Sequence, residues 1–123
     1  MLAGAGMWPL TSLGMWTIAR RKDDEAVGHG GIFDFLRDSD PPIAGKAEMG
    51  WILDPEAQGK GYAREAGEAM LGWFDRNFGK QDIWALISVG NEPSMKLARK
   101  LGFIQQSDGV YRDKLQTLWL RPA

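Results

Sequence analysis

The residues from Gln58 to Ala63 have the composition of a loop that binds phosphate. Gln-Gly-Lys-Gly-Tyr-Ala stands where an expected strand gives way to an expected helix. Glycines allow backbone amides to approach a ligand closely, and a helix N-terminus attracts an anion through its N–H groups and its dipole. Lys60 adds a positive charge. The loop is neither a Walker loop nor the three-glycine dinucleotide fingerprint, so by itself it is weak evidence for a phosphate site.

A second motif gives this loop a family context. Asn91-Glu92-Pro93-Ser94, followed by the run from Leu97 to Phe103, resembles the Asn-x-x-Ser…Lys-Leu-Gly-Phe helix of the GNAT superfamily. The loop is similar to the Gln/Arg-x-x-Gly-x-Gly/Ala signature with which that superfamily holds the pyrophosphate of acetyl-CoA. The resemblance covers roughly residues 14–121 and is to the RimJ/RimL-like branch. It implies transfer of an acetyl group from acetyl-CoA to a primary amine by direct attack in a ternary complex.

The resemblance also assigns residues to the cofactor. It implies a pyrophosphate site made of Gln58, Gly59, Lys60, Gly61, Tyr62 and Ala63. The backbone of the preceding strand would bind the pantetheine arm through Trp51, Ile52 and Leu53, with one amide polarising the thioester carbonyl; core burial of the first and last is the simpler alternative. Asn91 resembles the Asn that hydrogen-bonds the same arm, and it is equally a good helix N-cap.

Acetyl transfer to an amine needs a base. An alkyl ammonium has a pKa near ~10.4, so freeing its lone pair at neutral pH costs roughly 4–5 kcal/mol. Glu48 is the best candidate, acting through a water; alternatively, it is an edge-strand Glu that keeps the sheet soluble. Ala98 stands where many members place a Tyr that protonates the thiolate, and Ser94 is the substitute suggested by this branch. A CoA thiol resembles Cys, with a pKa of ~8.5, so its thiolate is already a fair leaving group.

The elements that would position these residues predict an α/β fold, in which helices flank a mixed sheet. Apolar periodicity and turn residues predict the order β-β-β-α-β-α-β-β, with strands at 14–20, 26–36, 47–53, 82–89, 103–105 and 115–120 and helices at 62–78 and 91–101. A strand, helix and strand in series imply a central parallel pair within a mostly antiparallel sheet. We expect loops at 37–46 and 54–61 and a turn at 107–109. Gly30-Gly31 predicts a bulge or a close approach of two strands.

The first helix carries an apolar stripe. It consists of Tyr62, Ala66, Ala69, Met70, Trp73 and Phe78. Gly67 and Gly72 lie inside the helix, and we favour close packing against the sheet as their reason. Gly79 is the expected C-terminal stop.

Composition limits the remaining classes. The 123 residues fit a single domain over 1–123, and six Trp and five Phe give it a core. A net charge of −1 argues against nucleic acid. There is no Cys and only His29 as histidine, so we expect no metal site and a structural role for that residue. No apolar run approaches the ~20 residues of a membrane span, and a cytoplasmic location fits.

A full fold of this branch begins with a strand and two helices before the first hairpin. We therefore expect an N-terminally short domain, with residues 1–10 as the tail of the second helix. An uncovered sheet edge would favour a homodimer. The acceptor, a small-molecule amine or a protein N-terminus, would lose one wall of its site. The alternative function is therefore a catalytically impaired acyl-CoA-binding module.

Overall fold

The computed structural model describes residues 5–9, 15–33, 39–43 and 45–123. The elements follow one another as β1 (Ala5–Pro9), β2 (Met15–Arg20), β3 (Ala26–Phe33), β4 (Ser39–Asp40), β5 (Glu48–Leu53), the 3-10 helix η1 (Pro55–Ala57), α1 (Tyr62–Phe78), β6 (Ile83–Ser88), α2 (Glu92–Lys100), β7 (Ile104–Tyr111) and β8 (Lys114–Arg121). They form two compact units. The first unit comprises Met1–Ile32 and Gly50–Gly79, and the second comprises Phe33–Met49 and Lys80–Ala123. β5 contributes residues to both.

The expected α/β class is confirmed. β5 and β6 are parallel, whereas β1–β2, β2–β3, β4–β7, β6–β8 and β7–β8 are antiparallel. The predicted order of eight elements is present, and β1 and β4 are two further strands.

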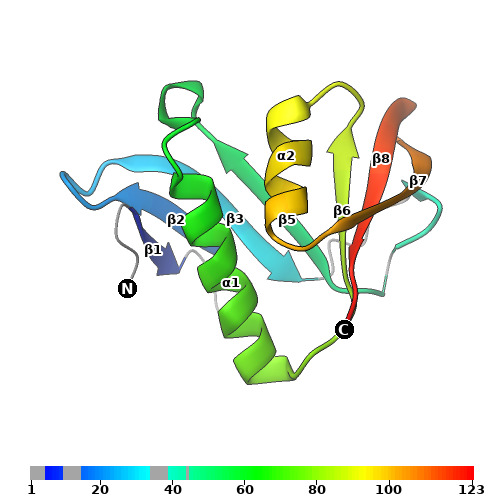
Figure 1. The fold of residues 1–123 in the computed structure, drawn as a ribbon, viewed down its shortest axis with the longest axis horizontal. Coiled ribbons are helices and arrows are strands. Elements are labelled where there is room, and N and C mark those ends of the chain that lie inside the picture. Colours follow the sequence, from blue (N-terminus) through cyan, green and yellow to red (C-terminus); the bar gives the residue numbers. More distant parts are fainter. Residues whose placement is uncertain (1–4, 10–14, 34–38, 44) are drawn as a thin grey trace. The chain divides into compact units, whose positions relative to one another are not determined.

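In the first unit, α1 packs against β1 and β2, and Figure 1 shows the helix crossing in front of β2. The Trp16 indole of β2 meets the Trp73 indole of α1 edge-on, with ring centroids 4.6 Å apart. Ile18 and Met70 are fully buried in the same unit. The helix ends as predicted at Gly79, whose N–H donates to the Asp75 carbonyl at 3.0 Å.

β3 and the end of β5 approach each other closely in this unit. A Cβ built on Gly30 would lie 2.8 Å from the Gly50 carbonyl oxygen, and one on Gly28 would overlap the Ile52 carbonyl oxygen. The close approach predicted at Gly30 is therefore confirmed. Just beyond β5, the Asp54 N–H donates to the Val27 carbonyl at 2.7 Å.

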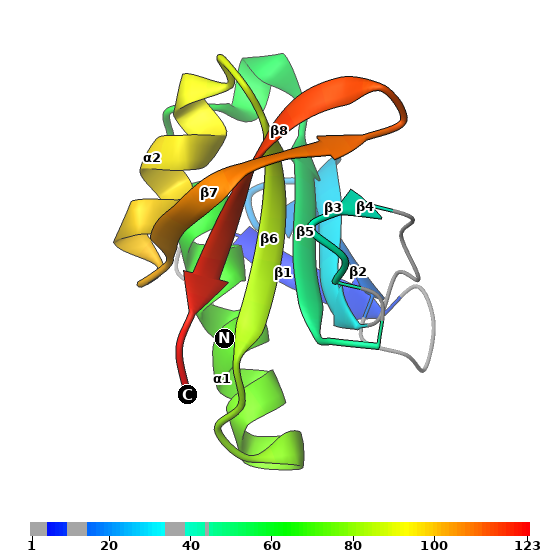
Figure 2. The same cartoon turned by 90° about the vertical axis from the view of Figure 1, so that its right-hand side faces the viewer.

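In the second unit, Glu48 at the start of β5 pairs with Trp84 of β6. The sheet continues from β6 through β8 and β7 to β4. Figure 2 shows the β7–β8 hairpin next to β6, with α2 along one face. A buried polar chain joins two of these strands. The Trp119 indole N–H donates to the Thr117 hydroxyl at 2.8 Å, and that hydroxyl donates to the Ile87 carbonyl at 2.9 Å.

Three expectations about chain segments are wrong. Residues 5–9 are not the tail of a helix, because β1 pairs with β2 from Ala5↔Arg20 to Pro9↔Trp16 and so satisfies its backbone groups in a sheet. The loop at 37–46 contains the two-residue strand β4, which ends before its prolines and pairs with β7. The turn expected at 107–109 belongs to β7, and the chain reverses instead at Arg112 and Asp113, both with positive φ.

Two expectations about α1 are also wrong. Phe78 does not continue the buried stripe, because it occupies the last helical position and is 56% exposed. A Cβ at Gly72 would meet only the Arg76 side chain of the same helix, at 3.1 Å, and not the sheet. Gly67 is buried, and its packing role remains a prediction.

Among the described residues, no helix is long and apolar enough to cross a membrane. The same part of the chain contains no group of three or more His, Cys, Asp or Glu residues placed to hold a metal ion.

Candidate active site

The connection from β5 to α1 is a short, internally bonded turn in the first unit. The Ala57 N–H donates to the Asp54 carbonyl at 2.9 Å, and the Gln58 N–H donates to the Pro55 carbonyl at 3.3 Å. The side chain of Gln58 donates back to the Leu53 carbonyl at 3.3 Å. Ala57 is buried beneath this turn. These hydrogen bonds fix the conformation of the chain at the point where the predicted loop begins, directly after η1.

The two glycines of the loop are required by the backbone. Gly59 and Gly61 have φ of 76° and 82°, in the left-handed region that glycine adopts readily. A Cβ built at either position would have no heavy atom within 4 Å apart from the glycine itself and its two neighbours in the chain. The backbone is therefore uncovered at both glycines, as close approach to a ligand requires.

The N-terminus of α1 follows directly. Gly61 is its N-cap and provides no side-chain cap. The first N–H groups of a helix have no acceptor inside the helix, and the Glu65 N–H is bonded to the Gly61 carbonyl at 3.1 Å. Lys60 is exposed beside these amides, whereas Tyr62 and Ala63 are half-buried. The arrangement suits an anion.

The predicted pantetheine strand is only partly buried. Trp51 and Leu53 are half-buried, so neither is a pure core residue, and Ile52 between them is 61% exposed. An exposed isoleucine on a strand that leads into the loop offers an apolar contact to a ligand.

Glu48 lies in the second unit and is only 2% exposed. The Trp84 N–H of β6 donates to the Ala47 carbonyl at 2.9 Å on one side of β5. On its other side, β5 runs against β3, as the glycine contacts show. The edge-strand interpretation of Glu48 is therefore wrong, since β5 has a neighbour on each side.

The second motif begins α2, also in the second unit. Asn91 is the N-cap, and its side-chain oxygen accepts from the Ser94 N–H at 3.3 Å. The N-cap role is confirmed, and a contact with a pantetheine arm stays a prediction. Ser94 is half-buried in the first turn. Ala98 is completely buried, and its methyl group has no hydroxyl to donate a proton.

The predicted residues thus fall into two groups. The first unit brings together Trp51, Ile52, Leu53, Gln58, Gly59, Lys60, Gly61, Tyr62 and Ala63, and the second holds Glu48, Asn91 and Ser94. Arg20, which is clamped by Asp23 in the β2–β3 turn, was not among the predicted site residues. The sequence signal that could have indicated this ion pair is an Arg and an Asp three residues apart in a charged turn.

The chain was compared with known proteins. The model of the acetyltransferase (GNAT) domain matches residues 3–104. A human protein named alpha/beta-tubulin-N-acetyltransferase 9 is 33% identical over 90 residues, which are 73% of this chain and 43% of that protein. The chain spans about half the length of the curated relatives it matches.

Solved structures agree with this family. A GNAT-family acetyltransferase structure from Bordetella pertussis has a TM-score of 0.80 and 32% identity, covering 93% of this chain and 68% of that one. The structure of an aminoglycoside acetyltransferase, AAC(6')-Ib, solved with coenzyme A, has a TM-score of 0.69 and 16% identity. The match covers 89% of this chain and 66% of that one, and at this identity it supports the fold alone. With a family model over most of its length and a similar structure at this identity, the chain belongs to the GNAT acetyltransferase family.

Proposed function

We propose that this protein transfers an acetyl group from acetyl-CoA to a primary amine. The observation that carries the proposal is the loop of Gly59 and Gly61. Both residues have positive φ and open space above them, and they precede the uncapped N-terminus of α1. Backbone amides that meet an anion without side chains in the way fit a pyrophosphate. Acetyl-CoA, when bound, supplies an activated acetyl group as its thioester.

In this proposal, residues 58–63 hold the pyrophosphate and β5 holds the pantetheine arm. The loop amides and Lys60 balance the charge of the phosphates. Ile52 provides exposed apolar surface next to them. Asn91 has its side-chain oxygen engaged with Ser94 N–H, which leaves its amide N–H₂ as the donor for the arm.

Glu48 is the proposed base, and it comes to the site through the family resemblance. Its role is to remove a proton from the acceptor ammonium, so that the nitrogen lone pair is available for attack. A carboxylate shielded from bulk water suits proton transfer. Ser94 is the proposed proton donor to the departing sulfur. Because a thiolate is a fair leaving group, this second role is the smaller one.

For the acceptor, we propose the amine of a protein or peptide. The support is the 33% identity to a relative named as an acetyltransferase of tubulin. A peptide with a free N-terminus is therefore the first acceptor to test, with a polyamine and an aminoglycoside in the same panel.

The proposal is tested by binding and turnover together. Calorimetric titration with acetyl-CoA should give a micromolar Kd that Gly61→Glu abolishes, because the new carboxylate enters the phosphate site. Release of CoA thiol in the presence of the amine panel then measures turnover. Glu48→Gln should lower kcat by roughly 10²-fold at unchanged acetyl-CoA affinity. Glu68→Gln, an exposed residue of α1, is the matched control.

The outcomes separate the two functions. Tight binding without turnover on any amine would support the acyl-CoA-binding module instead. A folded chain that does not bind acetyl-CoA at all would contradict both.

A further inference from the structure

The turn between β2 and β3 holds one arginine in a fixed position. Arg20 donates from Nε to Asp23 Oδ1 at 3.0 Å and from Nη2 to Oδ2 at 2.7 Å. The Glu25 N–H also donates to Asp23 Oδ1, at 3.1 Å. The backbone closes the same turn, because the Arg20 N–H donates to the Glu25 carbonyl at 2.8 Å. Bidentate Arg–carboxylate pairs fix the plane of the guanidinium.

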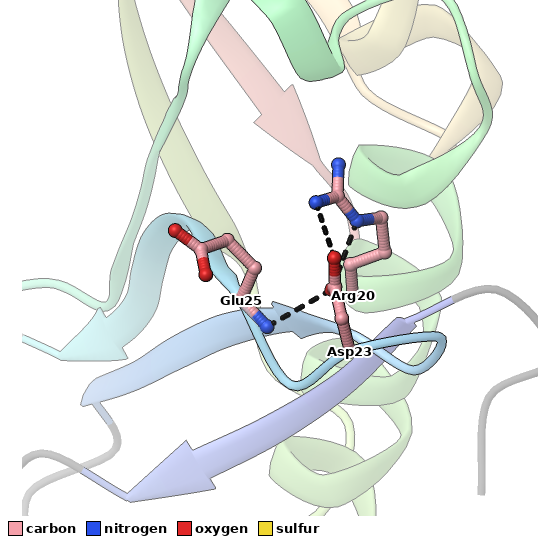
Figure 3. Close-up of polar contacts among 3 residues, drawn as sticks. All are labelled: Arg20, Asp23 and Glu25. Carbon is pink, nitrogen blue, oxygen red and sulfur yellow. Dashed lines mark hydrogen bonds and ion pairs between the residues drawn. The ribbon is translucent and has the colours of Figure 1, made fainter.

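This clamp presents the third guanidinium nitrogen outward. Figure 3 shows Nη1 of Arg20 directed away from Asp23. Nη1 has no hydrogen-bond acceptor among the described residues, and the Arg20 side chain is 29% exposed. Both oxygens of Asp23 are already engaged within the turn. The turn therefore leaves the N–H groups of Nη1 without an acceptor among the described residues.

The turn lies at the phosphate-loop end of the first unit. β3 leaves the turn at Ala26, and its second residue, Val27, accepts a hydrogen bond from Asp54, the first residue after β5. The Asp23 carboxylate raises the pKa of Arg20, and the Tyr62 phenol at the start of α1 contributes a smaller effect in the same direction. The hydrogen bond between Val27 and Asp54 thus brings the turn that holds Arg20 to the end of β5, which leads into the loop glycines.

A coenzyme A molecule carries charge beyond its pyrophosphate. The amides of Gly59 and Gly61, with Lys60, are the donors proposed for the pyrophosphate, and all come from one stretch of chain. The ribose 3′-phosphate is a separate dianion on the nucleotide end. A guanidinium with a free pair of donors is well matched to a phosphate. Resting on the proposed function, we propose that Arg20 binds the 3′-phosphate of coenzyme A.

The test compares two ligands that differ only at this phosphate. Calorimetry gives the Kd of CoA and of 3′-dephospho-CoA for the wild-type chain, for Arg20→Gln and for Arg76→Gln. The control removes the same charge at the opposite end of α1. We expect the wild type and the control to bind CoA about tenfold more tightly than the dephosphorylated ligand, as one charged hydrogen-bonding contact would give. Arg20→Gln should bind the two ligands equally, with its Kd for dephospho-CoA unchanged.

A second variant protects the test from misfolding. Arg20→Lys keeps the charge but cannot form the bidentate clamp with Asp23, and it should also lose most of the discrimination. The proposal is overturned if Arg20→Gln keeps the wild-type ratio, or if the wild type binds both ligands equally well. A wild-type chain that binds neither ligand contradicts the proposed function itself, so the two failures are distinguishable.

Discussion

Two glycines at the ends of α1 allow stability and binding to be separated. Gly61 precedes the helix with φ 82° and ψ −1°, and Gly79 follows it with φ 76° and ψ 173°. A Cβ at either position meets no atom within 4 Å. An alanine at these positions therefore introduces backbone strain without a steric clash inside the protein.

The cost of that strain can be estimated from the dihedral angles. For Gly61→Ala, the left-handed conformation of an L-residue costs roughly 1–2 kcal/mol. Gly79 occupies a region that is essentially restricted to glycine, so Gly79→Ala should cost about as much or more, within roughly 1–3 kcal/mol. Each kcal/mol corresponds to a fall in Tm of roughly 3–4 °C in a chain of this size.

Binding should respond to only one of the two variants. The methyl group at position 61 would stand in the open space above the loop, where the pyrophosphate is proposed to sit. We expect Gly61→Ala to raise the Kd of acetyl-CoA at least tenfold, and Gly79→Ala to leave it unchanged despite an equal or larger loss of Tm. Thermal unfolding and calorimetric titration of the three proteins measure both quantities. Equal losses of affinity in the two variants would refute the placement of the cofactor, since affinity would then follow stability.

Three further predictions concern the framework. Gly28→Ala forces a Cβ into the Ile52 carbonyl of β5, and this backbone atom cannot move aside as a side chain could. The variant should lose about 3 kcal/mol or more of unfolding free energy in urea. An unfolding free energy equal to that of the wild type would show that the two strands separate easily. The hydrogen bonds from Arg20 and from a backbone N–H lower the pKa of Asp23, so its contribution to stability is present above the ordinary pKa of about 4 and is lost as pH falls through the lower folded value. Asp23→Asn should therefore flatten the stability profile in that acidic range, and an unchanged profile would contradict the clamp. Asn91→Ala removes the α2 cap and should cost about 1 kcal/mol, whereas Asn91→Asp should keep the cap; equal melting temperatures for both variants would exclude a capping role.

Local signals were sufficient for much of the fold. The periodic apolar stripe and Gly79 defined α1 to the residue, and Asn91 with its following proline identified the start of α2. These signals act between residues that are neighbours in the chain. The loop glycines belong to the same class, since their positive φ is a property of each residue.

Signals that depend on distant residues were missed. Gly109 was interpreted as part of a turn, yet a Cβ there would lie 2.7 Å from the Asp40 carbonyl, so the residue admits β4 rather than reversing the chain. The true turn uses Arg112 and Asp113, and although Asp adopts positive φ more readily than most residues, Arg gives no such signal. An edge position stayed open as the alternative to a catalytic Glu48 because the neighbours of its strand could not be known from sequence. Arg20 was not among the predicted site residues, because the place of its turn near the end of β5 depends on how the strands pair.

The edge-on contact between Trp16 and Trp73 makes one event optically visible. Indoles at this distance couple electronically and give a circular dichroism signal that depends on their mutual orientation, so detachment of α1 from β2 would abolish it. Trp119 belongs to the second unit and has its N–H bonded within the protein, so its emission reports a separate environment. Because Trp8, Trp51 and Trp84 emit as well, Phe substitutions at those three positions would leave Trp16 and Trp73 to follow the loss of order in the first unit and Trp119 to follow it in the second.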